Sequence, residues 1–177
     1  MKLPDLETYL SRQLEIYLDT NGLNRTSERF EILRAAVSLD QSVEPFSARD
    51  LYNQYLALGG QAGRACIYQT LSLLEKAGIV VRTPVLIGTG IGYLLGYRFG
   101  NSIAHLCLYC NKINLYKRSR FVNTLSAINP KDTTAEGKAV FLYGACKQCR
   151  RVIQRNKQRV ERKNSRRQVS LSSLERK

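Results

Sequence analysis

The fold of this chain is decided by residues 47–78, which read SARDLYNQYLALGGQAGRACIYQTLSLLEKAG. Ser47, followed three residues later by an aspartate, has the form of a capping box, so a helix is expected to start after it. The pair at 59–60 is Gly-Gly and ends that helix. A second helix is expected over 63–77, with Gly78 as its left-handed cap residue. Two short helices joined by a glycine-containing turn predict a helix-turn-helix.

The second of these helices has two different faces. Helical spacing places Ile67, Leu71 and Leu74 on the inner stripe. Arginine can hydrogen-bond guanine through two bonds, and glutamine can do the same with adenine. We therefore interpret the outer side as a candidate DNA-binding face, with a merely solvated helix face as the alternative. The residues on that outer side are Arg64, Tyr68, Gln69 and Ser72.

The residues after this helix predict a β-hairpin. Residues 79–82 are typical of a strand, residues 83–92 form a turn-rich tip, and residues 93–99 predict a returning strand. A hairpin in this position is the wing of a winged helix. We therefore expect an N-terminal winged-helix DNA-binding domain over residues 1–98.

Two further helices are expected upstream of the helix-turn-helix. Apolar residues recur at helical spacing over 6–18, and Asn21-Gly22 then acts as a stop signal. Another helix is expected after Thr26. With the wing, these elements predict the α+β class, in which a winged helix (helix-turn-helix plus β-hairpin wing) precedes a second, small α/β domain.

The second domain is expected over residues 99–153, where the character of the sequence changes. It is predicted to contain a strand at 113–116, a helix at 120–128 and a strand at 139–143. Residues 154–177 are expected to form a basic C-terminal tail. That tail has little to bury, so we expect it to continue as a helix and then to lose order.

Four of the five cysteines form two C-x-x-C pairs, Cys107/Cys110 and Cys146/Cys149. Two intervening residues let a tight turn aim both sulfurs at one point, and two such knuckles supply the thiolates of a tetrahedral zinc site. Disulfides or buried unligated cysteines are the alternatives, and disulfides fit poorly in a chain without an export signal. Because a four-sulfur site has no open position, we expect one structural zinc per chain. Cys66 is interpreted as a small, half-buried side chain.

The charge of the chain points to a polyanionic partner. Lys and Arg number 28 against 14 Asp and Glu, which gives +14, and residues 150–177 alone carry +9. Such a charge suits nucleic acid or an anionic membrane surface. No run of 18 apolar residues and no secretory signal occurs, so we expect a cytoplasmic protein that does not span a membrane. No Ser/His/Asp set, phosphate loop or open metal site is present, so an enzyme is not expected.

Taken in order, these pieces resemble the ferric uptake regulator family of bacterial metal-dependent repressors. The resemblance covers roughly residues 20–150. It implies a winged-helix domain followed by a dimerisation domain, and homodimers that bind palindromic operators in double-stranded DNA. We therefore expect a sequence-specific transcriptional regulator that acts as a repressor. The resemblance is carried by residues 22–29, 32–33, 47–52, 65–71, 74 and 77–80 and by both C-x-x-C pairs.

The same resemblance implies roles for single residues. Arg29 and Tyr68 fall at DNA-contacting positions of the family. Gln69 stands where the family commonly has an arginine that contacts DNA, so the resemblance implies DNA binding but does not determine the operator sequence. Arg25 and Arg29 are expected to contact phosphates, which position a protein on DNA without specifying its sequence.

The regulatory metal site of the family is predicted to be lost. Family members place a His-x-His pair at positions that fall here on Ser102 and Ala104, whereas the single histidine of this chain is His105. No Asp or Glu occurs between Glu75 and Asp132. One imidazole cannot form a ferrous site without several partners.

Two alternatives stay open at this point. An effector-binding protein on the same fold could use a small effector such as haem, because a single histidine can be an axial ligand to haem iron. The second alternative is a protein that binds DNA without sequence preference. The basic tail could add nonspecific affinity for DNA by counterion release. A solvated helical extension is the simpler interpretation of that tail.

Overall fold

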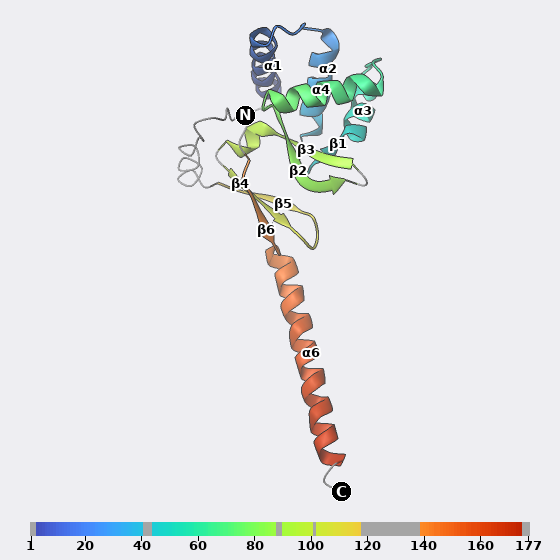
Figure 1. Cartoon of the computed structure of the whole chain (residues 1–177), viewed down its shortest axis with the longest axis vertical. Coiled ribbons are helices and arrows are strands. Elements are labelled where there is room, and N and C mark those ends of the chain that lie inside the picture. The colour runs from blue at the N-terminus through green and yellow to red at the C-terminus, as the bar shows by residue number, and fades with distance from the viewer. Residues whose placement is uncertain (1–2, 41–43, 88–89, 101, 118–138, 175–177) are drawn as a thin grey trace.

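The computed structural model describes residues 3–40, 44–87, 90–100, 102–117 and 139–174. Within these ranges the chain is an α+β protein, with a helical N-terminal part, two small sheets and a long C-terminal helix (Figure 1). No helix in the described part is both long and apolar enough to cross a membrane. The elements in order are α1 (Leu3–Thr20), α2 (Ser27–Leu39), β1 (Phe46–Ser47), α3 (Ala48–Ala57), α4 (Arg64–Lys76), β2 (Val80–Ile87), β3 (Gly90–Leu95), η1 (Gly96–Phe99), β4 (Ser102–Cys107), β5 (Ile113–Lys117), β6 (Phe141–Gly144) and α6 (Lys147–Leu174).

The four N-terminal helices share one apolar core with the first sheet. The helices predicted over 6–18 and after Thr26 are confirmed as α1 and α2. Each helix has an apolar face that it can bury only against the others, which fixes the bundle. Leucines four residues apart line the buried face of α1: Leu6, Leu10, Leu14 and Leu18.

Side-chain contacts fix both ends of α3. The predicted capping box is confirmed, because the Ser47 hydroxyl accepts from the Asp50 amide at 3.2 Å and the Asp50 carboxylate accepts from the Ser47 amide at 2.8 Å. At the other end, the Tyr55 hydroxyl accepts from the Ala62 amide at 3.2 Å. A Cβ on Gly60 would lie only 2.2 Å from the Tyr55 ring, so the turn closes directly over that ring.

The predicted cap of α4 is also confirmed. Gly78 has a φ of 67°, which favours glycine, and its amide donates to the Glu75 carbonyl at 2.9 Å. The Ile79 amide donates to the Leu74 carbonyl at 2.9 Å. Gly96 then packs so closely that a Cβ there would lie 2.3 Å from the Gly78 carbonyl oxygen. The end of α4 therefore fixes where the wing begins.

The wing exists, but its predicted boundaries are wrong. Strand β2 continues to Ile87 and β3 begins at Gly90, so most of the predicted tip over 83–92 is paired strand. The pairing shifts between Thr83 and Leu86, where Pro84 lies, and a proline is tolerated where the ladder is interrupted. The returning strand ends at Leu95 and gives way to the 3-10 turn η1. Strand β1, too short to be visible in the sequence pattern, pairs with β3.

The second sheet has the order β5-β4-β6. Strand β4 is antiparallel to β5 and parallel to β6, with Ala104 opposite both Leu115 and Phe141. The strands predicted at 113–116 and 139–143 are confirmed as β5 and β6, with ends that differ by one or two residues. Strand β4, at the centre of this sheet, was not predicted. The helix predicted over 120–128 lies outside the described residues.

Helix α6 projects away from the rest of the chain (Figure 1). It runs from Lys147 to Leu174 as one helix, so the expected loss of order does not occur within the described residues. The division expected between residues 153 and 154 falls inside this helix, and the division expected between 98 and 99 falls inside η1.

A buried ion pair joins the end of α2 to η1. The Asp40 carboxylate accepts from Arg98 Nε at 2.8 Å and from the Tyr97 hydroxyl at 2.7 Å. The Asp40 side chain is only 3% exposed, whereas Arg98 is 17% exposed. Burial, with the hydrogen bond to Asp40, raises the pKa of Tyr97 to about 12, so its hydroxyl keeps its proton at neutral pH. This cluster ties the helical core to the segment that leads into the second sheet.

Replacing Arg98 with Met is expected to lower the free energy of unfolding by about 3 kcal/mol, because the Asp40 carboxylate would stay buried without its cation. Arg82→Met is the matched control, since the Arg82–Glu75 pair is 53% and 31% exposed. An exposed pair contributes less than about 1 kcal/mol. Urea denaturation of the two variants checks this, and equal losses would contradict it.

Candidate metal centre and DNA-binding surface

Four cysteine side chains converge where the second sheet meets α6. Cys107 is the last residue of β4 and Cys110 follows in the next turn, whereas Cys146 precedes α6 and Cys149 lies in its first turn. The four sulfur atoms all lie within 4.8 Å of one another. The Cys110 and Cys146 sulfurs are 3.9 Å apart. The structure therefore brings both predicted C-x-x-C pairs to one point.

The backbone explains how knuckles 35 residues apart in the sequence come together. The Cys107 carbonyl accepts from the amide of Asn111, whose φ of 56° is left-handed, and this closes the first knuckle. The Leu108 amide donates to the Gly144 carbonyl at 3.0 Å and joins the two knuckles. Sequence reasoning missed this link, because it depends on the parallel pairing of β4 with β6, for which no local signal exists.

The electrostatics of the cluster favour a mixture of protonation states in the absence of a cation. Burial would raise the pKa of the Cys107 thiol, but the amides of Cys146, Tyr109 and Cys110 outweigh this effect and lower it to about 6. The Cys146 amide lies 3.2 Å from the Cys107 sulfur. Hydrogen bonding to the neighbouring sulfurs, chiefly Cys146, and burial raise the pKa of Cys149 to about 12. Thiolates so close together repel, so a cation is needed before all four can ionise.

The residues fit a tetrahedral metal ion. With metal–sulfur bonds of about 2.3 Å, the sulfurs of a tetrahedral site are about 3.8 Å apart, close to the 3.9 Å between Cys110 and Cys146. A disulfide needs about 2.05 Å, and all four cysteines are free in the structure. Four thiolates suit zinc and leave no position for water or substrate.

Among the described residues, no second group of His, Cys, Asp and Glu side chains converges in this way. His105 lies in β4 between Asn114 and Leu142 of the neighbouring strands. Its ring contacts the Tyr116 ring edge-on, with centroids 6.3 Å apart. Its Nδ1 atom is buried without a hydrogen-bond partner in the described part of the chain. These contacts give no support to haem as an effector.

The candidate DNA-binding face of α4 lies on the surface, as predicted from its spacing. Ile67, Leu71 and Leu74 are buried, whereas Tyr68 is 61% exposed. The Arg64 guanidinium lies over the Tyr52 ring, 5.4 Å from its centroid. Tyr52 of α3 was not singled out in the sequence, and it restrains Arg64 at the start of the face. The four residues predicted for this face are all exposed, as are Ala65 and Lys76 of the same helix: Arg64, Tyr68, Gln69 and Ser72.

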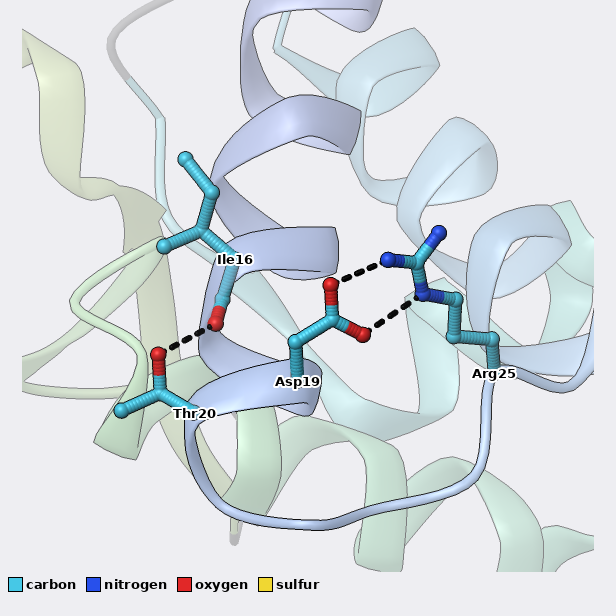
Figure 2. A network of polar contacts seen from close by, with 4 residues as sticks. All are labelled: Ile16, Asp19, Thr20 and Arg25. Carbon is cyan, nitrogen blue, oxygen red and sulfur yellow. Dashed lines mark hydrogen bonds and ion pairs between the residues drawn. The ribbon is translucent and has the colours of Figure 1, made fainter.

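The two arginines expected to meet phosphates lie in and just after the loop between α1 and α2. Arg25 pairs with the Asp19 carboxylate, with one Nε–Oδ1 contact of 2.8 Å (Figure 2). The hydrogen bond from Arg25 lowers the pKa of Asp19. Arg29 donates to the Asn24 carbonyl within the same loop. The hydrogen bonds of these arginines go to residues of α1 and of the loop, and not to the residues of the α4 face.

Cys66 lies on α4, away from the sulfur cluster. It is half-buried and packs against the helical core, in agreement with the sequence interpretation. It is therefore a suitable control for experiments on the four clustered cysteines.

A family model described as the ferric uptake regulator family matches residues 20–134 of this chain. The chain is 28% identical over 151 residues to the ferric uptake regulation protein of Synechococcus elongatus, a match that covers 82% of this chain and 99% of the relative. It is 28% identical over 126 residues to the protein of the same name from Vibrio parahaemolyticus, covering 71% and 82% of the two chains.

Solved structures share the fold. The Pseudomonas aeruginosa ferric uptake regulator with manganese matches with a TM-score of 0.56 and 24% identity, over 73% of this chain and 95% of that one. The Helicobacter pylori ferric uptake regulator, described as having three functional metal-binding sites, matches with a TM-score of 0.55 and 18% identity, over 85% and 95%.

Removing one ligand of the cluster is expected to destabilise the second sheet, because the four thiolates converge only in the folded chain and metal binding is therefore coupled to folding. We expect Cys146→Ser to lower the melting temperature by about 10 °C or more, the size of shift that ~2 kcal/mol produces in a small domain. A strong chelator should do the same to the unaltered protein. Cys66→Ser, the matched control, should lower the melting temperature far less, because Cys66 is only partly buried and lies outside the cluster. Equal melting of Cys146→Ser and the control would contradict the role of the cluster.

Proposed function

Because this chain belongs to the ferric uptake regulator family, we propose that it is a sequence-specific DNA-binding transcriptional regulator that acts as a repressor. Members of this family are metal-responsive DNA-binding transcription regulators. For this chain the proposal rests on the two faces of α4. Its outer side presents polar and aromatic groups, whereas its inner side is buried in the core.

The chemistry of that outer side suits the major groove of double-stranded DNA. Gln69 can pair with adenine and Arg64 with guanine, and the ring of Tyr68 can contact a thymine methyl or a phosphate. The turn closed over Tyr55 and the buried residues Ile67, Leu71 and Leu74 attach α4 to the core, so these groups would approach the bases together. Ser72 extends the same face by one turn.

Arg25 and Arg29 would contact phosphates beside the groove. The Arg25–Asp19 pair is exposed, with side chains 49% and 55% accessible, so solvent screens it. A phosphate can therefore replace Asp19 as the partner of Arg25 at little cost. Such contacts fix the position of the protein on DNA without specifying its sequence.

The four clustered cysteines would hold one zinc ion per chain. When bound, the ion neutralises the thiolates and links β4 to the base of α6. The amide groups around Cys107 stabilise its thiolate, and the link between Leu108 and Gly144 keeps the two knuckles in register. Because four sulfurs complete a tetrahedral shell, this ion would maintain shape and would not take part in catalysis.

The chain would act as a homodimer through residues 99–153, with residues 1–98 as the DNA-binding domain. Exposed apolar groups on and beside the second sheet support this assignment, because a small sheet that exposes them gains by covering them. Strands β5 and β6 are also the edges of the described sheet, and an edge can pair with another chain. The exposed side chains are Leu108, Tyr109, Tyr116, Leu142 and Tyr143.

The regulatory metal site of the family would be lost in this chain. His105 is the only histidine, and no Asp or Glu occurs between Glu75 and Asp132. Within the described residues the sulfur cluster is the one group of His, Cys, Asp and Glu that could hold a metal. DNA binding by the zinc-loaded protein would then be independent of iron and manganese.

Selection of preferred duplexes from a random pool, followed by footprinting, tests the proposed function. A two-fold symmetric protected site is expected. Gln69→Ala should weaken binding to that site by about 1–3 kcal/mol and relax the preference at one base position. Tyr68→Ala should also weaken binding, whereas Tyr9→Ala, an exposed tyrosine of α1, should not. Equal binding to all duplexes would instead favour a protein without operator specificity.

The lost regulatory site has its own test. The affinity of the zinc-loaded protein for its selected site should change less than about twofold when ferrous or manganous ions are added, because the chain lacks the nitrogen and oxygen ligands that these ions prefer. His105→Gln should not change this result. A gain in affinity of about tenfold or more with iron would contradict the assignment, since that is ~1.4 kcal/mol of coupling between the two sites.

A further inference from the structure

Within the part of the chain that the structure describes, helix α6 is attached to the protein at its base. Cys149 lies in its first turn, and the Arg150 amide donates to the Cys146 carbonyl, so the sulfur cluster holds the start of the helix. Beyond this base, α6 extends away from both sheets (Figure 1). From Lys147 to Arg162 all side chains are exposed except those of Cys149 and Ile153.

Helix α6 carries a large excess of positive charge. The helix contains ten basic residues and a single carboxylate, Glu161, which gives a net charge of +9. Four of its arginines recur at intervals of three or four residues, so they lie within an arc of about 80° on one side of the helix. We name these residues the arginine face: Arg151, Arg155, Arg159 and Arg162.

This arrangement disfavours an isolated helix. Like charges four residues apart repel one another along a helix, as Arg151, Arg155 and Arg159 do. The helix also has no broad apolar face to bury, since after Cys149 the only apolar residues up to Arg162 are Val152, Ile153 and Val160. A partner that supplies a row of negative charges would remove the repulsion and stabilise the helix.

The chemistry of the arginine face selects among polyanionic partners. A membrane surface would require a broad apolar face, which α6 lacks. Pairing with α6 of a second copy would bring like charges together without a sustained apolar seam. Guanidinium groups fit phosphates through paired hydrogen bonds. The face extends over about 16 Å, and an equal length of one DNA strand carries about five phosphates.

We propose that the arginine face of α6 contacts the phosphate backbone of duplex DNA, as a sequence-independent contact in addition to the base-contacting helix α4. This inference rests on the proposed function, because duplex DNA is taken as the partner. The sulfur cluster anchors the base of α6 to the second sheet. The arginines would therefore approach the phosphate backbone of the DNA from a fixed attachment point on the protein. The winged helix would then select the site, and α6 would add affinity at any sequence.

The test uses the full-length, zinc-loaded protein and measures its affinity for a duplex of arbitrary sequence at increasing salt. The test variant is R151Q/R155Q/R159Q. Its matched control, R12Q/R34Q/R82Q, removes three exposed charges outside the second sheet and α6. Glutamine and arginine have similar helix propensities, and circular dichroism verifies that α6 is retained. The variant R151K/R155K/R159K keeps the charge on the same face.

Each phosphate contact contributes about 0.9 to the slope of log affinity against log salt. The test variant should therefore lose about 2–3 from that slope, whereas the control and the lysine variant should lose less than about one. Equal slopes for the test variant and the control would overturn the proposal. So would a loss of binding to vesicles of phosphatidylcholine and phosphatidylglycerol with an unchanged DNA slope, because the partner would then be a membrane.

The two proposals fail in different ways. If no preferred duplex is selected but the test variant still loses its slope, the operator-specific function is wrong and the arginine face still binds DNA. If a preferred site is found and its base preferences are unchanged in every α6 variant while the slope is also unchanged, the arginine face does not contact DNA.

Discussion

The convergence of four thiol groups within 4.8 Å is the constraint on which the second half of this protein depends. The core beneath the second sheet is small and centres on Leu94, Phe99 and Leu106. Such a core contributes little burial, and small units of this kind are commonly stapled by a metal or by disulfides. A cation at the cluster would turn mutual repulsion between thiolates into attraction to a common centre. It would therefore supply the stability that the core lacks.

The cluster and the Asp40–Arg98 pair act at opposite ends of the same segment. The ion pair fixes η1 to the helical core, and the cysteines fix the end of β4 to the start of α6. Strands β4, β5 and β6 lie between them in the chain. These two linkages, together with the packing of Leu94 of β3 against the second core, connect the helical part to the base of α6. In the proposed function, one part of the protein selects a DNA site, and the other carries the dimer contacts and a positively charged arm.

Much of the fold follows from local signals. Ser47 with Asp50 predicts the start of α3, and Gly78 predicts the end of α4. Each C-x-x-C pair predicts a knuckle. These signals can be recognised in the sequence because each acts within a few residues. The features that sequence reasoning missed are non-local. Strand β4 is positioned by pairing with strands on both of its sides. The ion pair joins Arg98 to Asp40, which is 58 residues earlier in the chain. Pro84 was interpreted as part of a turn, although the irregular pairing around it lets both strands continue.

We infer that Cys107, Cys110, Cys146 and Cys149 bind one zinc ion that maintains the structure of the second half of the chain. X-ray absorption at the zinc edge of the purified protein tests this inference. We expect one zinc per chain with a single shell of four sulfurs at about 2.3 Å. A shell that contains nitrogen or oxygen ligands, or a folded protein without bound metal, would contradict it.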